Sequence, residues 1–373
     1  MKITDLETPA IIVRKEALEK NLASYQAACD ANGKALWPMV KTHKSTALAL
    51  RQKEVGAAGF LCGTLDECEA LCEQGLEPIM YAYPPAGAVS CKRAAALAAK
   101  GEFFVRLDGA EAAGMLNAAA KEQDVVIPYT IIIDCGLHRF GVAPEKCVAL
   151  AKELASFSHL QLKGISSHAG HVYGEADPAK ISGYAKEEAA ALRTAKEALV
   201  AAGFECTMVT TGSTPTFWGN VEDEVITVYH PGNYVFHDVI QMANGTAAEK
   251  DCALAVLATV ISHPGEDLFL CDAGAKCLGL DQGAHGNASV RGHGRVIGHP
   301  ELVVIGLSEE VGKLKVEGST DLKVGDRILI LPNHACSSAN LTDYLILVDR
   351  AGEVVGEIAV DIRGNRTGKK FEP

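Results

Sequence analysis

The sequence predicts an α/β protein in which an N-terminal (β/α)8 barrel is followed by a C-terminal antiparallel β domain. From residue 35 onward, short β-branched or aromatic runs alternate eight times with longer alanine-rich amphipathic runs, as parallel strands joined by helices do. After Gly245, alternating strand-like runs are separated by Gly, Pro and Asn instead. The 373 residues are 48% hydrophobic, which is enough for a substantial core.

The eight predicted barrel strands extend over about 200 residues, which favours a (β/α)8 barrel. A doubly wound sheet is the alternative, but no Gly-x-Gly-x-x-Gly turn follows the first strand. Helices rich in Ala, Leu, Glu and Lys are expected between the strands, for example at 45–55, 64–74, 86–100 and 178–202. The predicted strands cover residues 35–40, 59–63, 78–83, 102–108, 127–134, 160–168, 206–212 and 225–230.

The predicted β domain contains strands at 254–262, 268–272, 302–307, 327–331 and 344–348. A further strand at 10–13 precedes the barrel and is a candidate to pair with this domain. We therefore expect an N-terminal segment at 1–14, a barrel at 15–240 and a β domain at 241–373.

Composition excludes several classes of function. The chain has 47 acidic residues against 35 Lys and Arg, a formal charge of -12, so no broad basic field indicates nucleic-acid binding. No apolar run of about 18 residues predicts a membrane span, and no secretory signal is visible, so we expect a cytoplasmic protein without a membrane partner. The twelve cysteines lie mostly in apolar or helical stretches and are expected to be reduced core thiols. Small-molecule chemistry becomes the default class, and a structural or interaction protein is the alternative.

In a (β/α)8 barrel the chemistry lies at the C-terminal ends of the strands. Lys41 occupies such a position, directly after the first barrel strand. One interpretation is an ordinary exposed lysine. The other is a Schiff-base lysine, whose amine must be held near apolar walls to be unprotonated and nucleophilic.

Two glycine-containing turns follow the seventh and eighth strands, where barrels commonly bind phosphate. Backbone amides and hydroxyls at a helix N-terminus form an anion site. Either turn alone is a weak signal, since glycine and proline punctuate most loops, but together they predict a phosphorylated ligand. The turns contain Gly212, Ser213, Thr214, Gly232, Asn233 and Tyr234.

Arg139 and His168 follow the fifth and sixth strands. The arginine can donate to a phenolate or carboxylate, and the histidine can stack against a ring or form a hydrogen bond with it. A salt-bridged arginine and a loop histidine are the alternative interpretation.

The β domain places His334 and Cys336 after an apolar strand. Alternate residues of an extended segment face the same side, so an imidazole and a thiolate at this spacing could share one metal ion and leave positions open for water or substrate. The spacing by itself is a weak signal. The pairs Cys68 with Cys72 and His293 with His299 are interpreted as structural or solvated.

Taken in order, these segments resemble the D-serine dehydratase and D-threonine aldolase family, within the alanine-racemase-like pyridoxal phosphate enzymes of fold type III. The resemblance covers nearly the whole chain. Its carriers are the segments 5–9, 40–44, 134–136 with Arg139 and Gly141, 167–171, 212–216, 231–236, 272–276, 307–310 and 332–336.

The resemblance implies that Lys41 forms a Schiff base with pyridoxal 5'-phosphate and that Gly212, Ser213, Thr214, Gly232 and Asn233 hold the phosphate. It further implies that Arg139 approaches the phenolic oxygen, that His168 lies against the ring, and that Tyr173 contacts ring or substrate. Tyr234 belongs to the same predicted cofactor-binding turn. His334 and Cys336 would bind a divalent metal, and a thiolate ligand favours zinc.

Three departures matter, two from the racemases and one from the family itself. The tyrosine that racemases present in a Gly-Tyr-x-Asp-Gly context is absent, which disfavours two-base racemisation. His230 corresponds to the racemase arginine near the pyridine nitrogen. Val311 stands after Glu309 and Glu310, where the family often has histidine.

The resemblance therefore implies a lyase acting on D-3-hydroxy amino acids, in which Lys41 removes the α proton and a metal at His334 and Cys336 assists loss of the β-hydroxyl. D-Serine dehydration is the preferred reaction, because Cys336 resembles the dehydratase branch, whereas aldolases of the family tend to have aspartate there. D-Threonine aldolase is the alternative, followed by a racemase or a non-catalytic pyridoxal phosphate carrier. Members of this architecture pair head to tail, so we expect a homodimer.

Overall fold

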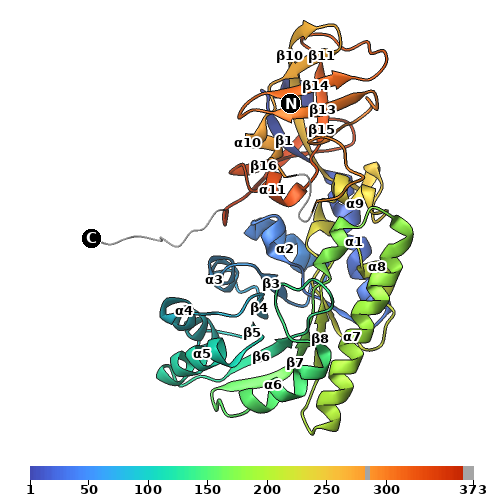
Figure 1. Ribbon diagram of the computed structural model, residues 1–373. Coiled ribbons are helices and arrows are strands. Elements are labelled where there is room, and N and C mark those ends of the chain that lie inside the picture. The colour runs from blue at the N-terminus through green and yellow to red at the C-terminus, as the bar shows by residue number, and fades with distance from the viewer. Residues whose placement is uncertain (282–285, 364–373) are drawn as a thin grey trace.

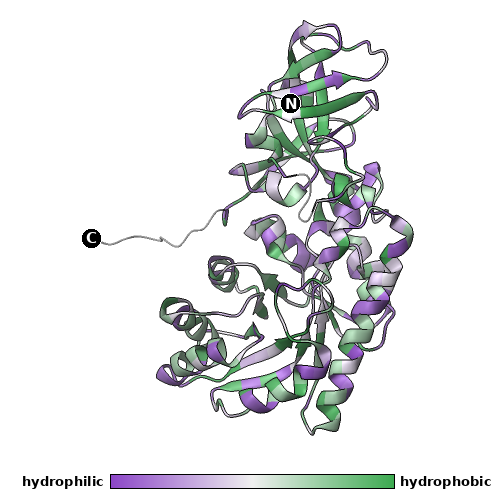
Figure 2. Ribbon diagram, viewed as in Figure 1, coloured by the Kyte–Doolittle hydropathy of each residue, from purple (hydrophilic) through white to green (hydrophobic). Residues whose placement is uncertain are grey.

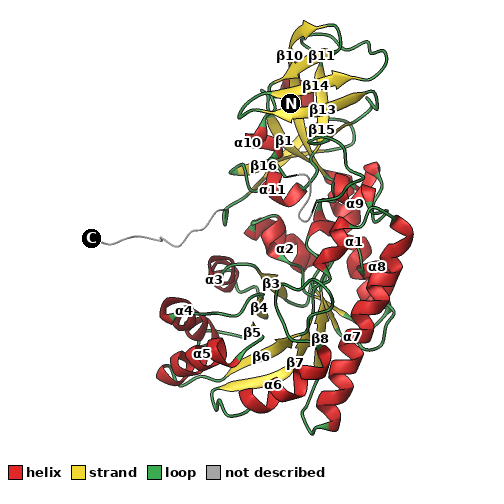
Figure 3. Cartoon of the chain, viewed as in Figure 1, coloured by secondary structure: helices red, strands yellow, loops and turns green. Residues whose placement is uncertain are grey.

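The computed structural model describes residues 1–281 and 286–363 and has two parts, a barrel and a β domain above it (Figure 1). Figure 3 shows helices surrounding the strands of the lower part and an upper part built mainly of strands. The predicted fold class is confirmed. No helix in the described part of the chain is both long enough and apolar enough to cross a membrane.

The barrel sheet has eight parallel strands in the order β2-β9-β8-β7-β6-β5-β4-β3. A parallel bridge between Met39 and Leu61 closes it, and the Leu61 amide donates to the Pro38 carbonyl over 2.9 Å. The strands lie within the eight predicted ranges and are shorter: β2 (Ala35–Leu36), β3 (Phe60–Cys62), β4 (Ile79–Tyr81), β5 (Phe103–Leu107), β6 (Ile127–Ile132), β7 (Leu160–Ser166), β8 (Met208–Thr211) and β9 (Val228–Tyr229).

Helices alternate with these strands and cover them from outside (Figure 1). Ser45 and Thr64 cap two of them, because their hydroxyls accept the Leu48 and Glu67 amides. The helices are α1 (Lys15–Ala31), α2 (Thr46–Val55), α3 (Leu65–Glu73), α4 (Ala88–Ala98), α5 (Ala110–Glu122), α6 (Cys147–Leu154), α7 (Ile181–Ala201), α8 (Phe217–Asn220) and α9 (Val239–Ala243). Figure 2 shows hydrophobic strands inside and helices whose hydrophilic residues are interspersed with hydrophobic ones, as amphipathic cover requires.

The β domain is a nine-stranded sheet in the order β11-β14-β13-β12-β15-β10-β1-β16-β17. Strand β1 (Ala10–Arg14) comes from the N-terminus and lies between β10, to which it is antiparallel, and β16, to which it is parallel. The other strands are β10 (Leu254–Gly265), β11 (Leu268–Cys271), β12 (Arg295–Val296), β13 (Leu302–Leu307), β14 (Gly312–Val316), β15 (Arg327–Leu331), β16 (Tyr344–Val348) and β17 (Val354–Ala359).

Strands β12, β14 and β17 were not predicted from the sequence. Strand β14 has the burial pattern of a half-exposed strand, with Lys313 and Lys315 outward and Leu314 inward. Two lysines interrupt its apolar residues, and such alternation is what a one-sided sheet requires.

The β domain also has two short helices, α10 (Ala275–Leu278) and α11 (Ala335–Ala339), of which α11 faces the barrel. Helix α11 reaches the 3-10 turn Val40–Thr42 that follows β2, since the Asn340 amide nitrogen lies 3.5 Å from the Lys41 carbonyl oxygen. All twelve cysteines are free thiols and nine are buried, so the predicted reduced core thiols agree with the structure.

Candidate functional site

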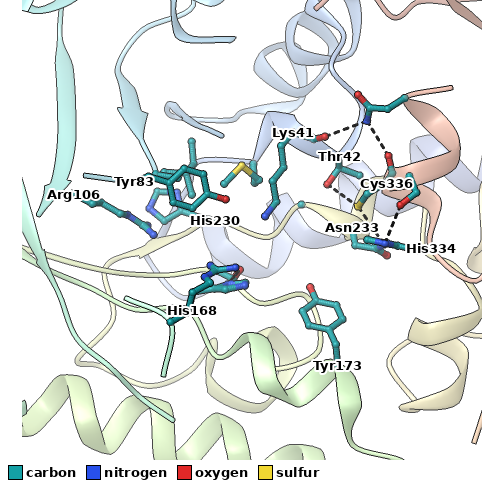
Figure 4. Close-up of a pocket in the computed structure, with 18 residues that line it drawn as sticks. Lys41, Thr42, Tyr83, Arg106, His168, Tyr173, His230, Asn233, His334 and Cys336 are labelled. Atoms are coloured by element: carbon teal, nitrogen blue, oxygen red, sulfur yellow. Dashed lines mark hydrogen bonds between the residues drawn. The ribbon is translucent and has the colours of Figure 1, made fainter. Parts of the chain in front are cut away.

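A cavity of about 480 Å³ lies where the C-terminal ends of the barrel strands meet α11 of the β domain. Its volume lies within the range of small-ligand sites. Nine of the predicted site residues line it together: Lys41, Arg139, His168, Tyr173, Gly212, Gly232, Asn233, His334 and Cys336. In Figure 4, His230, Arg106 and Tyr83 lie on one side of Lys41, and Asn233, His334 and Cys336 lie on the other.

Lys41 extends into this cavity (Figure 4), and no described residue forms a hydrogen bond or ion pair with its amine. The turn that carries it is held rigidly. A Lys44–Glu67 ion pair of 2.6 Å is nearly inaccessible to solvent, and Glu67 also accepts the Gly63 amide over 2.6 Å. The His43 ring accepts the Ser45 amide over 3.1 Å. An amine that lines a cavity without a described partner, on a turn fixed by its neighbours, fits the nucleophile interpretation.

The two glycine turns come close to neighbouring groups in a way that only glycine permits. A Cβ on Gly212 would lie 2.5 Å from the His230 Cβ, and one on Gly232 would lie 2.6 Å from the Thr42 Oγ1. The Ser213 hydroxyl is buried without a partner in the described structure. Buried polar groups are normally satisfied, so this orphaned hydroxyl fits a ligand such as a phosphate group.

Thr214 and Tyr234 lie behind the cavity wall. The Thr214 hydroxyl accepts the Tyr234 amide over 3.2 Å, and the Thr214 amide donates to the Tyr173 hydroxyl over 3.4 Å. The Tyr234 ring packs on Tyr25 in the core, and its hydroxyl accepts from Gln52 over 3.0 Å. Tyr234 therefore orders the turn through its backbone, and its side chain points away from the cavity.

His168 and His230 each have one ring nitrogen fixed by a carbonyl group. The Nδ1 atom of His168 donates to the Gly212 carbonyl over 2.8 Å, and that of His230 donates to the Trp37 carbonyl over 2.9 Å. Burial, reinforced by nearby cations, lowers the pKa of both rings well below the usual value. The Nε2 atom of His230 is buried without a described partner, so a neutral acceptor lines the cavity.

Arg106, which the sequence analysis missed, lines the same cavity from inside β5. Its guanidinium donates to the Thr210 hydroxyl over 3.1 Å, and no described carboxylate forms an ion pair with it. Burial lowers the Arg106 pKa to about 10. The available signal was an arginine within an apolar predicted strand. Arg139, which was predicted, lies over the rings of Tyr83 and Phe140 at 6.0 and 5.4 Å.

His334 and Cys336 face the cavity from the start of α11 (Figure 4). The Nδ1 atom of His334 lies 2.8 Å from Asp281, and Ser337 donates to the same carboxylate over 2.6 Å. This contact leaves the Nε2 atom of His334 available as a metal ligand, in the carboxylate–histidine arrangement common at metal sites. Asp281 could not be predicted, because it is 53 residues away in sequence.

Charge couples the two predicted ligands. Burial opposes the charge on His334, but Cys336 and Asp281 prevail and raise the histidine pKa well above its usual value. Burial also opposes the Cys336 thiolate, yet His334 lowers the thiol pKa. The Cys336 sulfur lies 3.4 Å from the Thr42 hydroxyl. A soft thiolate beside an imidazole fits zinc.

Within residues 1–281 and 286–363, no three His, Cys, Asp or Glu side chains are arranged to hold a metal ion. A metal at His334 and Cys336 would therefore have two side-chain ligands from the described chain and open positions. Open positions are typical of catalytic rather than structural zinc.

Asp238, also missed by the sequence analysis, joins the two halves of the site. Its buried carboxylate accepts the Asn233 amide over 2.5 Å and the Ala335 backbone amide over 2.9 Å. Asn233 belongs to a predicted phosphate turn and Ala335 lies between the two predicted metal ligands. One carboxylate thus fixes the distance between the two turns.

The residues interpreted as structural lie outside this cavity's lining. The Cys72 thiol is 3.5 Å from Glu77, and His299 pairs with Glu301 at 3.0 Å. Glu310, which precedes Val311, pairs with Lys276 at 2.7 Å on the surface.

Two protein families match the chain. The family described as "Alanine racemase, N-terminal domain" matches residues 13–238, and the "Putative serine dehydratase domain" matches residues 253–348. D-threo-3-hydroxyaspartate dehydratase of Delftia sp. (strain HT23) is 33% identical over 89% of this chain and 92% of its own length. D-serine dehydratase of Dictyostelium discoideum is 27% identical over 92% of this chain and 94% of its own length. D-threonine aldolase of Arthrobacter sp is 27% identical over 95% of this chain and 92% of its own length.

A solved structure of D-threo-3-hydroxyaspartate dehydratase aligns with a TM-score of 0.90 and 30% identity, over 98% of this chain and 100% of the other. That structure is a metal-free form in which a cysteine has been replaced by alanine. In another solved mutant of the same enzyme, a histidine two positions earlier has been replaced. The histidine and cysteine of that enzyme have the same spacing as His334 and Cys336.

Proposed function

Because this chain belongs to the D-serine dehydratase and D-threonine aldolase family of pyridoxal phosphate-dependent lyases, we propose that it dehydrates a D-configured 3-hydroxy amino acid, with D-serine as the substrate. The observation that carries the proposal is one cavity that holds both the Lys41 amine and the His334–Cys336 pair. The reaction needs a base at Cα and an acid at the β-hydroxyl, and the cavity offers a candidate for each.

Lys41 is the proposed base. Its amine carries no described partner, and Met39 and Leu61 contribute apolar side chains to the neighbouring wall. Bound pyridoxal phosphate would supply the electron sink for the electrons left at Cα. Gly212, Ser213, Thr214, Gly232 and Asn233 are the proposed phosphate site, His168 the ring contact, and Arg139 the donor to the phenolic oxygen.

His334 and Cys336 are the proposed ligands of zinc, which would act as a Lewis acid that helps the hydroxide to leave. Asp281 holds the imidazole so that its Nε2 atom faces the cavity. Tyr173 borders the space between this pair and Lys41 and is proposed to contact the substrate. Loss of the α proton and the β-hydroxide amounts to one water, and the aminoacrylate that remains hydrolyses to pyruvate and ammonia.

Two neighbouring reactions remain candidates for specific reasons. D-threo-3-Hydroxyaspartate is an alternative substrate, because the dehydratase named for it is 33% identical to this chain. Retro-aldol cleavage is the alternative reaction, because a base placed at the β-hydroxyl instead of Cα breaks the Cα–Cβ bond in the same cavity. Cys336 favours dehydration, since the dehydratase relative also has a cysteine two positions after a histidine.

The test incubates the purified protein with pyridoxal phosphate, zinc and D-threonine, and identifies the products by mass spectrometry. 2-Oxobutanoate and ammonia are expected. Glycine and acetaldehyde would instead establish an aldolase and overturn the proposed reaction. Parallel reactions with D-serine and D-threo-3-hydroxyaspartate rank the substrates by kcat/KM, and the proposal of D-serine fails if hydroxyaspartate is strongly preferred.

A homodimer is part of the proposal. Sedimentation of the protein at several concentrations should give twice the 39.3 kDa mass of one chain. A monomer that is fully active would refute it.

A further inference from the structure

Glu188 is a fully buried carboxylate in the middle of α7, behind the ends of strands β7 and β8. The helix runs along these strands on the outside of the barrel (Figure 1). A buried charge is costly unless it is compensated, and no described lysine, arginine or histidine forms an ion pair with Glu188. Its compensation must come from hydrogen-bond donors.

Five donors surround this carboxylate. One oxygen accepts the Ser167 hydroxyl over 2.8 Å and the Ala169 amide over 3.2 Å, and it also accepts the Thr211 hydroxyl in a short contact. The other oxygen accepts the Thr216 hydroxyl over 3.0 Å and the Asn220 amide over 3.3 Å. An ionised carboxylate accepts only, so a shell made of donors suits the charged form.

The positions of these donors in the chain are informative. Ser167 and Ala169 are the two residues on either side of His168. Thr211 and Thr216 are the two residues that bracket the turn Gly212 to Pro215. A hydrogen bond from the His168 ring to the Gly212 carbonyl, over 2.8 Å, joins the two segments on the cavity side. Glu188 joins them from behind.

We propose that Glu188 is a positioning residue that holds the His168 segment and the glycine turn in one fixed relation, so that the ring and the phosphate of the cofactor are bound as a unit. This inference rests on the proposed cofactor site. Glu188 does not line the cavity, and it acts through Ser167, Thr211 and Thr216. Fixing these groups in advance removes an ordering cost from binding.

The informative variant is Glu188→Gln. It keeps the size of the side chain, and the Oδ1 atom of Asn220 is buried without a described partner, so the Asn220 amide can turn to accept the new donor. The variant is therefore expected to fold, while all five hydrogen bonds lose the assistance of the charge and those to the replaced oxygen are lost or reversed. The dissociation constants of pyridoxal phosphate and of pyridoxal are measured by absorbance titration of cofactor-free protein.

Two further variants each remove one of the hydrogen bonds to Glu188. Thr216→Val removes the bond to the glycine turn. It should weaken the binding of pyridoxal phosphate and leave the affinity for pyridoxal, which lacks the phosphate, unchanged. Ser167→Ala removes the bond to the His168 segment and should weaken the binding of both pyridoxal phosphate and pyridoxal. Glu188→Gln should raise the dissociation constant of pyridoxal phosphate by about tenfold or more, which is a larger effect than that of either Thr216→Val or Ser167→Ala. A tenfold change corresponds to about 1.4 kcal/mol of binding free energy.

The matched control is Asp223→Asn. Asp223 lies before β9, at the opposite end of the barrel. It pairs at 2.6 Å with Arg193 of α7, the helix that carries Glu188, and accepts the Val225 amide over 2.9 Å. The Asp223→Asn substitution should shift the melting temperature without changing either dissociation constant. If Glu188→Gln binds pyridoxal phosphate within twofold of the parent, or only in proportion to a general loss of stability shared with Asp223→Asn, the inference is overturned. If the parent itself does not bind pyridoxal phosphate, the proposed function fails instead.

Discussion

The two walls of the cavity are built differently. The barrel wall presents Lys41 on a turn that the buried Lys44–Glu67 ion pair holds in place. The β-domain wall presents His334 through Asp281, whose side chain is 33% exposed. Buried pairs are weakly screened and costly to break, whereas exposed ones contribute little. The barrel wall is thus prepared for a ligand by the fold, and we expect the proposed metal to add order to the β-domain wall.

The largest expected effect comes from the barrel wall. Lys41→Ala should abolish turnover and the visible absorbance of bound pyridoxal phosphate, because no other described lysine lines the cavity. Absorbance spectra and product assays measure both. Lys121→Ala, on an exposed position of α5, should change neither. If the Lys41 variant retained the absorbance, the proposal that Lys41 binds pyridoxal phosphate would be wrong.

The next effect isolates the β-domain wall. Cys336→Ala should lose zinc and reduce dehydration about 100-fold or more, since a Lewis acid contributes several kcal/mol to expulsion of hydroxide. The absorbance of bound pyridoxal phosphate should persist, because the barrel wall is intact. Metal analysis and chelation of the parent protein provide the check. Full activity after zinc is removed would show that a metal at the β-domain wall is not needed for dehydration.

The stability of the barrel wall can be measured directly. Glu67→Gln leaves the Lys44 ammonium without its buried partner and should lower the free energy of unfolding by about 3 kcal/mol. Chemical denaturation measures the loss. The control is Glu122→Gln, which breaks an exposed pair with Lys92 and should cost less than about 0.5 kcal/mol. Equal losses would contradict the contrast between buried and exposed pairs.

The smallest effect concerns the residue that orients His334. Asp281→Asn keeps a hydrogen-bond acceptor near the ring but removes the charge, and it should weaken zinc binding about tenfold. Competition with a chromogenic chelator measures the affinity. The stability of zinc-free protein should stay close to the parent value. A loss of stability as large as that of Glu67→Gln would mean that the β-domain wall is as rigid as the barrel wall.

The sequence was most informative where backbone periodicity and chemistry coincide. Lys41, Arg139, His168, Gly212 and Gly232 follow apolar runs, and the ends of parallel strands converge, so their meeting in one cavity could be predicted. Arg106 and Asp238 were missed, because a charged residue within an apolar strand or after a turn has many explanations until its partners are known.

The sequence by itself determined the alternation of strands and helices, the change of pattern after Gly245 and the residues at the strand ends, because periodicity and turn chemistry are local properties. Only the tertiary structure decided that α11 docks on the Lys41 turn, that Asp281 orients His334 across 53 residues, and that Glu188 ties His168 to the glycine turn. These relations depend on which elements pack together. Packing depends on the shape and burial of the whole chain, which no local pattern records.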